Sequence, residues 1–497
     1  MSDMRKEGVN ASQVLGAESG FFRQVQTRLA GRTRGFAGEE NGTMIIFGLT
    51  IFIMVLVATG MAIDFMRHEN MRSRLQSTLD RAVLAAADLD QMNDPKAVVE
   101  DYFAKSGLSG YDLDVDVKEG LNYRTVTASA SSEVNSMFLN MVGIDSIDAP
   151  AGGAAEERIN NVEISLVLDI SGSMDDNDKI ENMQHAAKEF VDTMITPDTK
   201  ELVSISIVPY TGQTNAGQTL FNALNVNQVH DYSYCVEFES SDFQSVPLNF
   251  SKQYAQMQHY EYSSRYYGSW ANYKIQDPWC SDKTDEEIKA FQNNNTELKR
   301  VIDSYRPRTA TGIHYAMKWA AALLDPSIRS TVSGMINTGT VDSVFEGRPA
   351  SYSDEETIKV IVLMTDGMNV DQYRIRSWAY NSTSEYQHWA KYTLWYYLNN
   401  YVYWRDRGDY YYFKQSNDQA DDQLDDICDA AKATGSKPSE AIVIFSIGFE
   451  INDNPAAKKV MSDCATSDSH FYAVEGVEIS DAFGAIARTI NQLRLIQ

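Results

Sequence analysis

For 21 consecutive positions, from Thr43 to Ile63, the chain carries no charged residue. A helix rises 1.5 Å per residue, so this stretch would extend about 31 Å, close to the roughly 30 Å hydrocarbon thickness of a bilayer. A cleaved secretory signal has a shorter apolar region and a shorter leader than the 42 residues found here, which favours an uncleaved anchor. We therefore predict a transmembrane helix at 43–63, preceded by a cytoplasmic leader at 1–42.

The helical pattern continues beyond the uncharged stretch. Apolar side chains recur at helical spacing, and they are Met71, Leu75, Leu79, Val83 and Ala86. This spacing predicts a single helical rod that runs from residue 43 to about residue 90.

A small α+β module is expected at 91–150. Apolar residues alternate with aspartates over 112–117, and a second alternating run covers 126–130. Alternation predicts two strands, each with one solvent-exposed face, joined into a hairpin by the turn at 119–120. The Ala- and Gly-rich residues 149–155 are expected to form a linker to the rest of the chain.

The remaining residues, 159–497, have the pattern of an α/β domain. Apolar runs bounded by turns alternate with amphipathic helical stretches, which implies a doubly wound, mainly parallel sheet. The expected strands are 162–169, 202–208, 359–364, 441–447 and 471–474. Two long insertions, at about 211–305 and 373–413, interrupt the pattern.

Oxygen-bearing side chains follow two of these strands. One strand ends in Asp169-Ile170-Ser171-Gly172-Ser173, and another ends in Thr365-Asp366-Gly367. The carboxyl ends of parallel strands meet at one edge of a sheet, where ligands collect. Thr311 stands just before a further amphipathic stretch and is placed to bring its hydroxyl to the same point, with Thr309 close by.

Together, these side chains would form a metal site made only of oxygen atoms. The predicted ligands are Asp169, Ser171, Ser173, Thr311 and Asp366. Two carboxylates and three hydroxyls suit Mg²⁺ or Mn²⁺ and disfavour zinc or copper. One coordination position can then be left for an acidic group on a partner. The alternative is that Asp169 and the hydroxyls only cap the following helix.

Two resemblances follow from these residues. The D-x-S-x-S pattern at 169–173, the remote Thr311 and the strand-ending Asp366 resemble the metal-ion-dependent adhesion site of von Willebrand factor A domains. The rod, with Gly42-Thr43-Met44 and Gly60-Met61-Ala62-Ile63-Asp64, resembles the start of bacterial TadE/TadG-like pilus-assembly proteins.

The combined resemblance implies both a fold and a function. The fold would be a von Willebrand factor A-like sheet behind a pilin-like rod. The function would be that of a membrane-anchored, non-enzymatic component of Tad/Flp-type pilus assembly. Its metal ion would bind an acidic residue on another protein of a pilus or secretion apparatus. The protein would cross the bacterial inner membrane once, with its C-terminal domain in the periplasm.

Other functions stay open at this point. A pilus-associated or surface-exposed adhesin is the first alternative, and a magnesium-dependent hydrolase is the second. The sequence contains no G-x-x-x-x-G-K, H-E-x-x-H or G-x-S-x-G motif, which argues against the enzyme. A net charge of −26 argues against a nucleic-acid partner, because phosphate binding needs clustered Lys and Arg.

The leader contains a candidate processing site. Gly35-Phe36 followed by Glu40 imitates the pattern that prepilin peptidases cleave. Residues 37–42 are polar where a pilin would already be hydrophobic, so an unprocessed cytoplasmic leader is the favoured interpretation.

The chain has four cysteines and no C-x-x-C spacing. An even number fits disulfides outside the reducing cytosol, and four reduced, buried thiols are the alternative. Three pairings are possible, and sequence neighbourhood favours Cys235 with Cys280 and Cys428 with Cys464.

The second insertion has an unusual composition. It contains 11 Tyr and 4 Trp among its 41 residues. Tyr and Trp supply rigid contact area with a polar tip, so Tyr373, Trp378, Tyr386 and Trp389 are candidates for partner contact. An aromatic core that covers the end of the sheet is an equally supported interpretation. His314, close to Thr311, is expected to face solvent from its helix.

Overall fold

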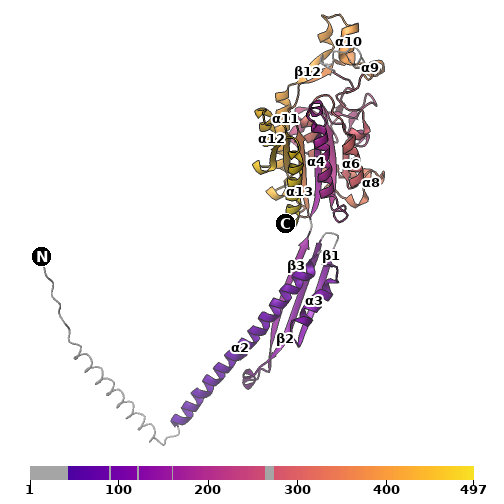
Figure 1. Ribbon diagram of the computed structural model, residues 1–497. Helices are drawn as coiled ribbons and strands as arrows, with labels where there is room; N and C mark the ends of the chain where they lie inside the picture. Colours follow the sequence, from indigo (N-terminus) through magenta and orange to yellow (C-terminus); the bar gives the residue numbers. More distant parts are fainter. Residues whose placement is uncertain (1–42, 89–90, 120–122, 159, 263–273, 497) are drawn as a thin grey trace, which may run out of the picture. The chain divides into compact units, whose positions relative to one another are not determined.

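The computed structural model describes residues 43–88, 91–119, 123–158, 160–262 and 274–496. They divide into an N-terminal unit that reaches Glu157 and a C-terminal unit that begins at Arg158 (Figure 1). The predicted leader at 1–42 and the processing site at Gly35-Phe36 lie outside the described residues.

One continuous helix, α2 (Thr43–Ala87), dominates the N-terminal unit. Among the described residues it is the one helix long and apolar enough to cross a membrane. Its large apolar side chains between Met44 and Leu56 are exposed, whereas Leu75 and Leu79 are fully buried. The predicted apolar helix is therefore confirmed, and its second half is a core element of a folded module.

That module is a three-stranded sheet covered by α2 and α3 (Pro95–Lys105). The strands are β1 (Tyr111–Glu119), β2 (Tyr123–Asn135) and β3 (Ser146–Arg158), in the order β1-β2-β3. β1 and β2 pair antiparallel, with Val117 opposite Val126, which confirms the predicted hairpin.

The linker expected at 149–155 is instead the middle of β3. Its alanines and glycines allow close packing rather than flexibility. Ala149 is fully buried, and a Cβ added to Gly153 would lie 2.9 Å from Leu79 Cδ2 of α2. Small residues that suggest a flexible linker here serve to bring a strand close to a helix.

The C-terminal unit is built on a six-stranded sheet with the order β14-β13-β10-β4-β5-β9. The strands are β4 (Asn161–Asp169), β5 (Val203–Tyr210), β9 (Lys289–Gln292), β10 (Thr357–Thr365), β13 (Val443–Phe449) and β14 (Phe471–Val474). All pairings are parallel except that of β9, which runs antiparallel at one edge. The doubly wound, mainly parallel sheet expected from the sequence is therefore present.

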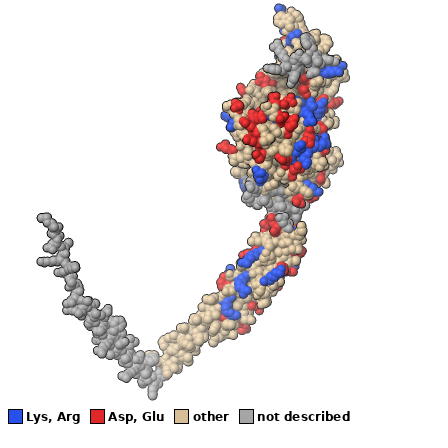
Figure 2. Space-filling model, viewed as in Figure 1, with Lys and Arg blue, Asp and Glu red and all other residues tan. Residues whose placement is uncertain are grey.

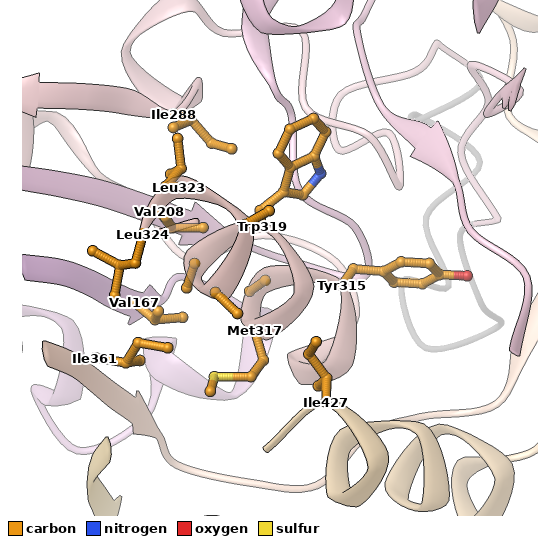
Figure 3. Close-up of a cluster of buried hydrophobic side chains, with 14 of the residues drawn as sticks. Val167, Val208, Ile288, Tyr315, Met317, Trp319, Leu323, Leu324, Ile361 and Ile427 are labelled. Atoms are coloured by element: carbon orange, nitrogen blue, oxygen red, sulfur yellow. The ribbon is translucent and has the colours of Figure 1, made fainter. Parts of the chain in front are cut away.

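Helices cover both faces of this sheet. Successive residues of β4 point to opposite faces, and each face has an apolar core of its own. Leu166 and Leu168 pack in the core with α4 (Lys179–Met194), α6 (Asn295–Ser304) and α13 (Glu478–Ile496). Val167 packs in the other core, with α7 (Ile313–Leu323), α11 (Asn417–Lys432) and α12 (Pro455–Cys464). Figure 3 shows Val167, Val208 and Ile361 from three adjacent strands facing α7.

Helix α7 is buried along its whole length, not on one face alone. The first insertion covers its outer side, where Lys318 Nζ donates to the carbonyl oxygens of Ser245 (2.7 Å) and Val246 (3.1 Å). His314 is fully buried, so the expectation that it faces solvent is wrong. Its Nδ1 lies 3.0 Å from Asn369 Oδ1, and burial lowers the pKa of His314 to about 4, which keeps the ring neutral.

The two insertions pack together in one hydrophobic cluster. Their short elements are α5 (Gly217–Ala223), β6 (Val226–Asn227), β7 (Val236–Glu237), β8 (Tyr254–Gln256), β11 (Gln372–Ile375), α9 (Thr383–Trp389), α10 (Leu394–Tyr401) and β12 (Tyr411–Gln415). Helix α8 (Arg329–Asn337) lies outside both insertions and packs in the core that contains α7. A buried ion pair between Glu237 and Arg374 joins the first insertion to the second.

Both expected disulfides are present. Cys235 and Cys280 are bonded within the first insertion, with their Cα atoms 5.9 Å apart. Cys428 of α11 and Cys464 of α12 are bonded with a Cα separation of 5.1 Å. The alternative of four reduced thiols is therefore wrong, and each bond ties together elements that lie close in sequence.

Candidate metal centre

The two central strands deliver both predicted carboxylates to one edge of the sheet. In the parallel pairing of β4 and β10, Leu168 lies opposite Met364. Asp169 follows Leu168 directly, and Asp366 lies two residues beyond Met364, so both carboxylates leave the sheet at the carboxyl ends of neighbouring strands.

Asp169 is fully buried and accepts three hydrogen bonds. Its Oδ1 accepts from the backbone N–H of Ser171 (2.8 Å), and its Oδ2 accepts from the hydroxyls of Thr365 (2.7 Å) and Tyr210 (3.1 Å). Burial, and next the negative charge of Asp366, raise the pKa of Asp169 to about 6. The carboxylate is thus rigidly held in a place where its negative charge is under-compensated.

The two serines connect the strand ends. Ser171 Oγ lies 3.1 Å from Ser173 Oγ, and Ser173 donates to Asp366 Oδ1 at 2.6 Å. Both predicted hydroxyl ligands of the D-x-S-x-S segment therefore sit beside the second predicted carboxylate, although 193 residues separate Ser173 from Asp366.

The segment that carries Thr311 lies beside the same strand ends. Gly172 N donates to Thr309 O at 3.1 Å, and Arg308 N donates to Ile170 O at 2.9 Å. Thr311 O in turn accepts from Val370 N at 3.1 Å, four residues beyond Asp366. Backbone hydrogen bonds therefore join the Thr311 segment to both of the other predicted ligand segments.

Four contacting residues were missed by the sequence reasoning. Lys179 Nζ lies 2.9 Å from Asp366 Oδ2 and 3.7 Å from Glu450 Oε2. Tyr210 and Thr365 donate to Asp169 as described above. Thr365 precedes Asp366 directly, so its position in the sequence indicates that it lies at the site, whereas nothing in the local sequence relates Glu450 or Tyr210 to the aspartates.

The donor set consists of carboxylates and hydroxyls. The described residues contain no group of three or more His, Cys, Asp or Glu side chains placed to hold a metal. Any cation held here would therefore depend on the hydroxyl oxygens of Ser171, Ser173 and Thr311 as well as on the two aspartates. Acidic side chains are also prominent on the visible face of the C-terminal unit (Figure 2).

The four aromatic candidates of the second insertion differ in exposure. Trp389 is buried, and its Nε1 donates to Ala379 O at 2.6 Å, so it belongs to the core of the insertion. Tyr373 and Tyr386 are half-buried, and Trp378 is 50% exposed. Tyr401, Tyr403 and Trp404 are also largely exposed. The insertion thus combines an aromatic core with an aromatic surface.

Comparison with known proteins identifies the N-terminal segment. Residues 42–89 match the family model described as "Putative Flp pilus-assembly TadE/G-like". The resemblance of the rod to TadE/TadG-like proteins is thereby confirmed. No curated protein sequence matches the chain.

Solved structures with similarity to the chain include domains of pilus proteins. The von Willebrand factor domain of the type V pili tip protein Mfa5 from Porphyromonas gingivalis matches at 15% identity and a TM-score of 0.35, covering 68% of this chain and 97% of that chain. The PilB minor pilin from Streptococcus sanguinis matches at 12% identity and a TM-score of 0.32, covering 77% and 78%. Proximal thread matrix protein 1 from the mussel byssus, with a zinc-occupied MIDAS motif, matches at 13% identity and a TM-score of 0.26. The match covers 67% of this chain and 46% of that chain.

Proposed function

We propose that this chain, whose N-terminal segment is TadE/G-like, is a membrane-anchored, non-enzymatic component of Tad pilus assembly. In this proposal α2 crosses the bacterial inner membrane once and the C-terminal unit lies in the periplasm. A divalent cation at the edge of the large sheet binds an acidic residue of another protein of the pilus apparatus.

The contacts between the predicted ligands are the observation that carries the metal proposal. A continuous chain of oxygen contacts joins Ser171, Ser173 and Asp366. Asp169 Oδ1 accepts a hydrogen bond from the backbone N–H of Ser171, at one end of this chain. Carboxylate and hydroxyl oxygens fit Mg²⁺ or Mn²⁺, which prefer hard ligands. A bound cation would also offset the repulsion between Asp169 and Asp366, and it would supply the positive charge that recognises a partner's carboxylate.

Two observations support the proposed placement. The apolar half of α2 exposes its large side chains, as a helix in contact with lipid does. Two disulfides in the C-terminal unit fit an oxidising compartment such as the periplasm.

Co-purification from membranes tests this function. We expect the full chain, extracted in detergent with Mg²⁺, to retain a protein of the pilus apparatus that is released by EDTA and restored by added Mg²⁺. Identification of that protein by mass spectrometry, together with recovery in the inner-membrane fraction, would support assembly. Equal retention with and without EDTA would contradict the proposed metal-dependent binding.

The exposed aromatic residues of the second insertion favour an adhesin as the second candidate. Trp378, Tyr401, Tyr403 and Trp404 present apolar area that a host or abiotic surface can bind. Recovery of the chain in sheared pili, rather than in the inner membrane, would support this alternative.

Lys179 provides a quantitative test of the proposed metal site. Its ammonium group contacts Asp366 and therefore competes with a bound cation for the same carboxylate. We expect Lys179→Met to tighten Mg²⁺ binding about fivefold, or ~1 kcal/mol, in calorimetric titration of the full chain. Lys188→Met, on the same helix but paired with Asp303, is the matched control. Unchanged or weaker binding in Lys179→Met would show that the lysine does not compete.

A further inference from the structure

The loop that connects β2 to β3 exposes an unusual amount of apolar surface. Residues 136–144 read Ser-Met-Phe-Leu-Asn-Met-Val-Gly-Ile and contain no charge. The side chains of Met137, Met141, Val142 and Ile144 are between 44% and 63% exposed. A group of exposed apolar side chains on one short loop marks an interaction surface.

This β2–β3 loop is attached to α2 by specific contacts. Asp64 is buried, and its carboxylate accepts backbone hydrogen bonds from Met137 (3.0 Å), Phe138 (2.7 Å) and Leu139 (2.9 Å). One turn earlier, a Cβ added to Gly60 would lie 2.4 Å from Phe138 Cγ, so the aromatic ring rests on the glycine. The loop is therefore fixed on the helix at residues 60–64, and Figure 1 shows the β2–β3 connection beside α2.

The attachment point coincides with the end of the uncharged stretch of α2. Asp64 is the first charged residue after that stretch, whose middle residue is Ile53. At 1.5 Å per residue, Gly60 and Asp64 lie about 10 and 17 Å along the helix from Ile53. Half the hydrocarbon thickness of a bilayer is about 15 Å. The loop thus lies where hydrocarbon would meet the headgroups.

The other sides of α2 are also apolar at this level. Ile63, Phe65 and Met66 are exposed around the same turn. The polar groups that hold the loop bond to the protein itself. The Asp64 carboxylate accepts three backbone hydrogen bonds, and Arg67, whose side chain is 40% exposed, donates to Asn135 O at 3.1 Å. The apolar surface around this turn is therefore continuous with the exposed apolar surface of the rest of the uncharged stretch.

We propose that the β2–β3 loop is a second membrane-contacting element, which inserts its apolar side chains at the boundary of the bilayer that α2 crosses. This inference rests on the proposed function, in which α2 spans a membrane. Insertion buries apolar side chains in lipid and sets the depth and rotation of α2, because the loop is fixed to one side of the helix. The small sheet is then seated on the membrane surface.

Site-specific labelling of the full chain tests the loop directly. Both disulfides use all four cysteines, so an introduced cysteine is the only free thiol. Met141→Cys is labelled with an environment-sensitive fluorophore in phosphatidylglycerol and phosphatidylethanolamine vesicles. The same label at Ile53→Cys reports whether the middle of the uncharged stretch of α2 lies in lipid. Lys118→Cys is the aqueous control, because its β2 partner Thr125 lies ten residues, or about 33 Å, before the end of β2.

We expect the label at Met141 to be quenched by lipids that carry a nitroxide near the headgroup and to lose quenching by aqueous iodide. The label at Lys118 should show the reverse, and the label at Ile53 should respond only to nitroxides deep in the bilayer. If Met141 behaves like Lys118 while Ile53 is in lipid, the loop proposal alone is wrong. Shielding of Met141 from both quenchers would mean that protein covers the loop, which also overturns it. Exposure of Ile53 to iodide would overturn the membrane anchor and the loop proposal together.

Discussion

Replacing Asp366 with asparagine is expected to weaken Mg²⁺ binding by at least about a hundredfold, or ~2.7 kcal/mol. The substitution removes one of the two negative charges that face the proposed cation. Two unit charges about 4 Å apart interact by ~4 kcal/mol at the effective dielectric constant of a protein surface, so a loss of this size is reasonable. Calorimetric titration of the full chain in detergent micelles measures it.

Asp366 is a cleaner position for this test than Asp169. An asparagine at 366 can still accept the hydrogen bond from Ser173 and keeps the same volume. It removes the ion pair with Lys179, which keeps Glu450 as its other acidic partner. Asp169, by contrast, is fully buried and accepts from three donors, so any substitution there also disturbs the packing of the strand ends. Asp468→Asn, on an exposed turn before β14, is the control that changes the same charge away from the site. Equal Mg²⁺ affinity in Asp366→Asn and Asp468→Asn would rule out Asp366 as a ligand.

The central sheet and the meeting of its two aspartates were predictable for a simple reason. Strands β4 and β10 are buried on both faces, so each contains an unbroken apolar run, 166–168 in β4 and 360–364 in β10, that is visible without knowing its neighbours. Once both strands are parallel members of one sheet, their carboxyl ends meet, and Asp169 must approach Asp366. The contact between Ser173 and Asp366 follows from that topology together with the 3-10 turn Gly172–Asp175, which carries Ser173 beside the strand ends.

Other features depend on which distant segment covers which surface, and sequence periodicity does not carry that information. The spacing of α7 indicated a helix with one apolar face, but the first insertion supplies carbonyl partners for Lys318 on the opposite face. Strands β6, β7 and β8 contain only two or three residues each, which is too short for alternation to be read. Lys179 follows three aspartates in the sequence, but its partners in the structure are the distant Asp366 and Glu450.

Gly172 determines how closely two of the proposed ligand segments approach each other. Its backbone N–H donates to Thr309 O at 3.1 Å, and a Cβ at this position would lie 2.7 Å from the same oxygen. Real side chains do not tolerate such a contact with backbone, so an alanine must push the Thr309 segment away. Gly172 is thus required by the close approach that brings Thr311 towards Ser171 and Ser173.

Gly172→Ala is therefore expected to lower the free energy of unfolding by about 1–3 kcal/mol, the usual cost of overpacking a tightly packed site. We also expect Mg²⁺ affinity to fall at least about tenfold, because a ligand set has to be held within about 0.5 Å of its productive geometry. Gly367→Ala is a matched control at the same site, since a Cβ there meets nothing within 4 Å. Denaturant unfolding measures the stability of the two variants, and calorimetry measures their Mg²⁺ affinity. A loss in Gly172→Ala alone shows that the contact with Thr309 O matters, and not glycine at the site in general. If Gly172→Ala binds Mg²⁺ as the unmodified chain does, the Thr311 segment does not contribute a ligand, and the site consists of the strand-end residues alone.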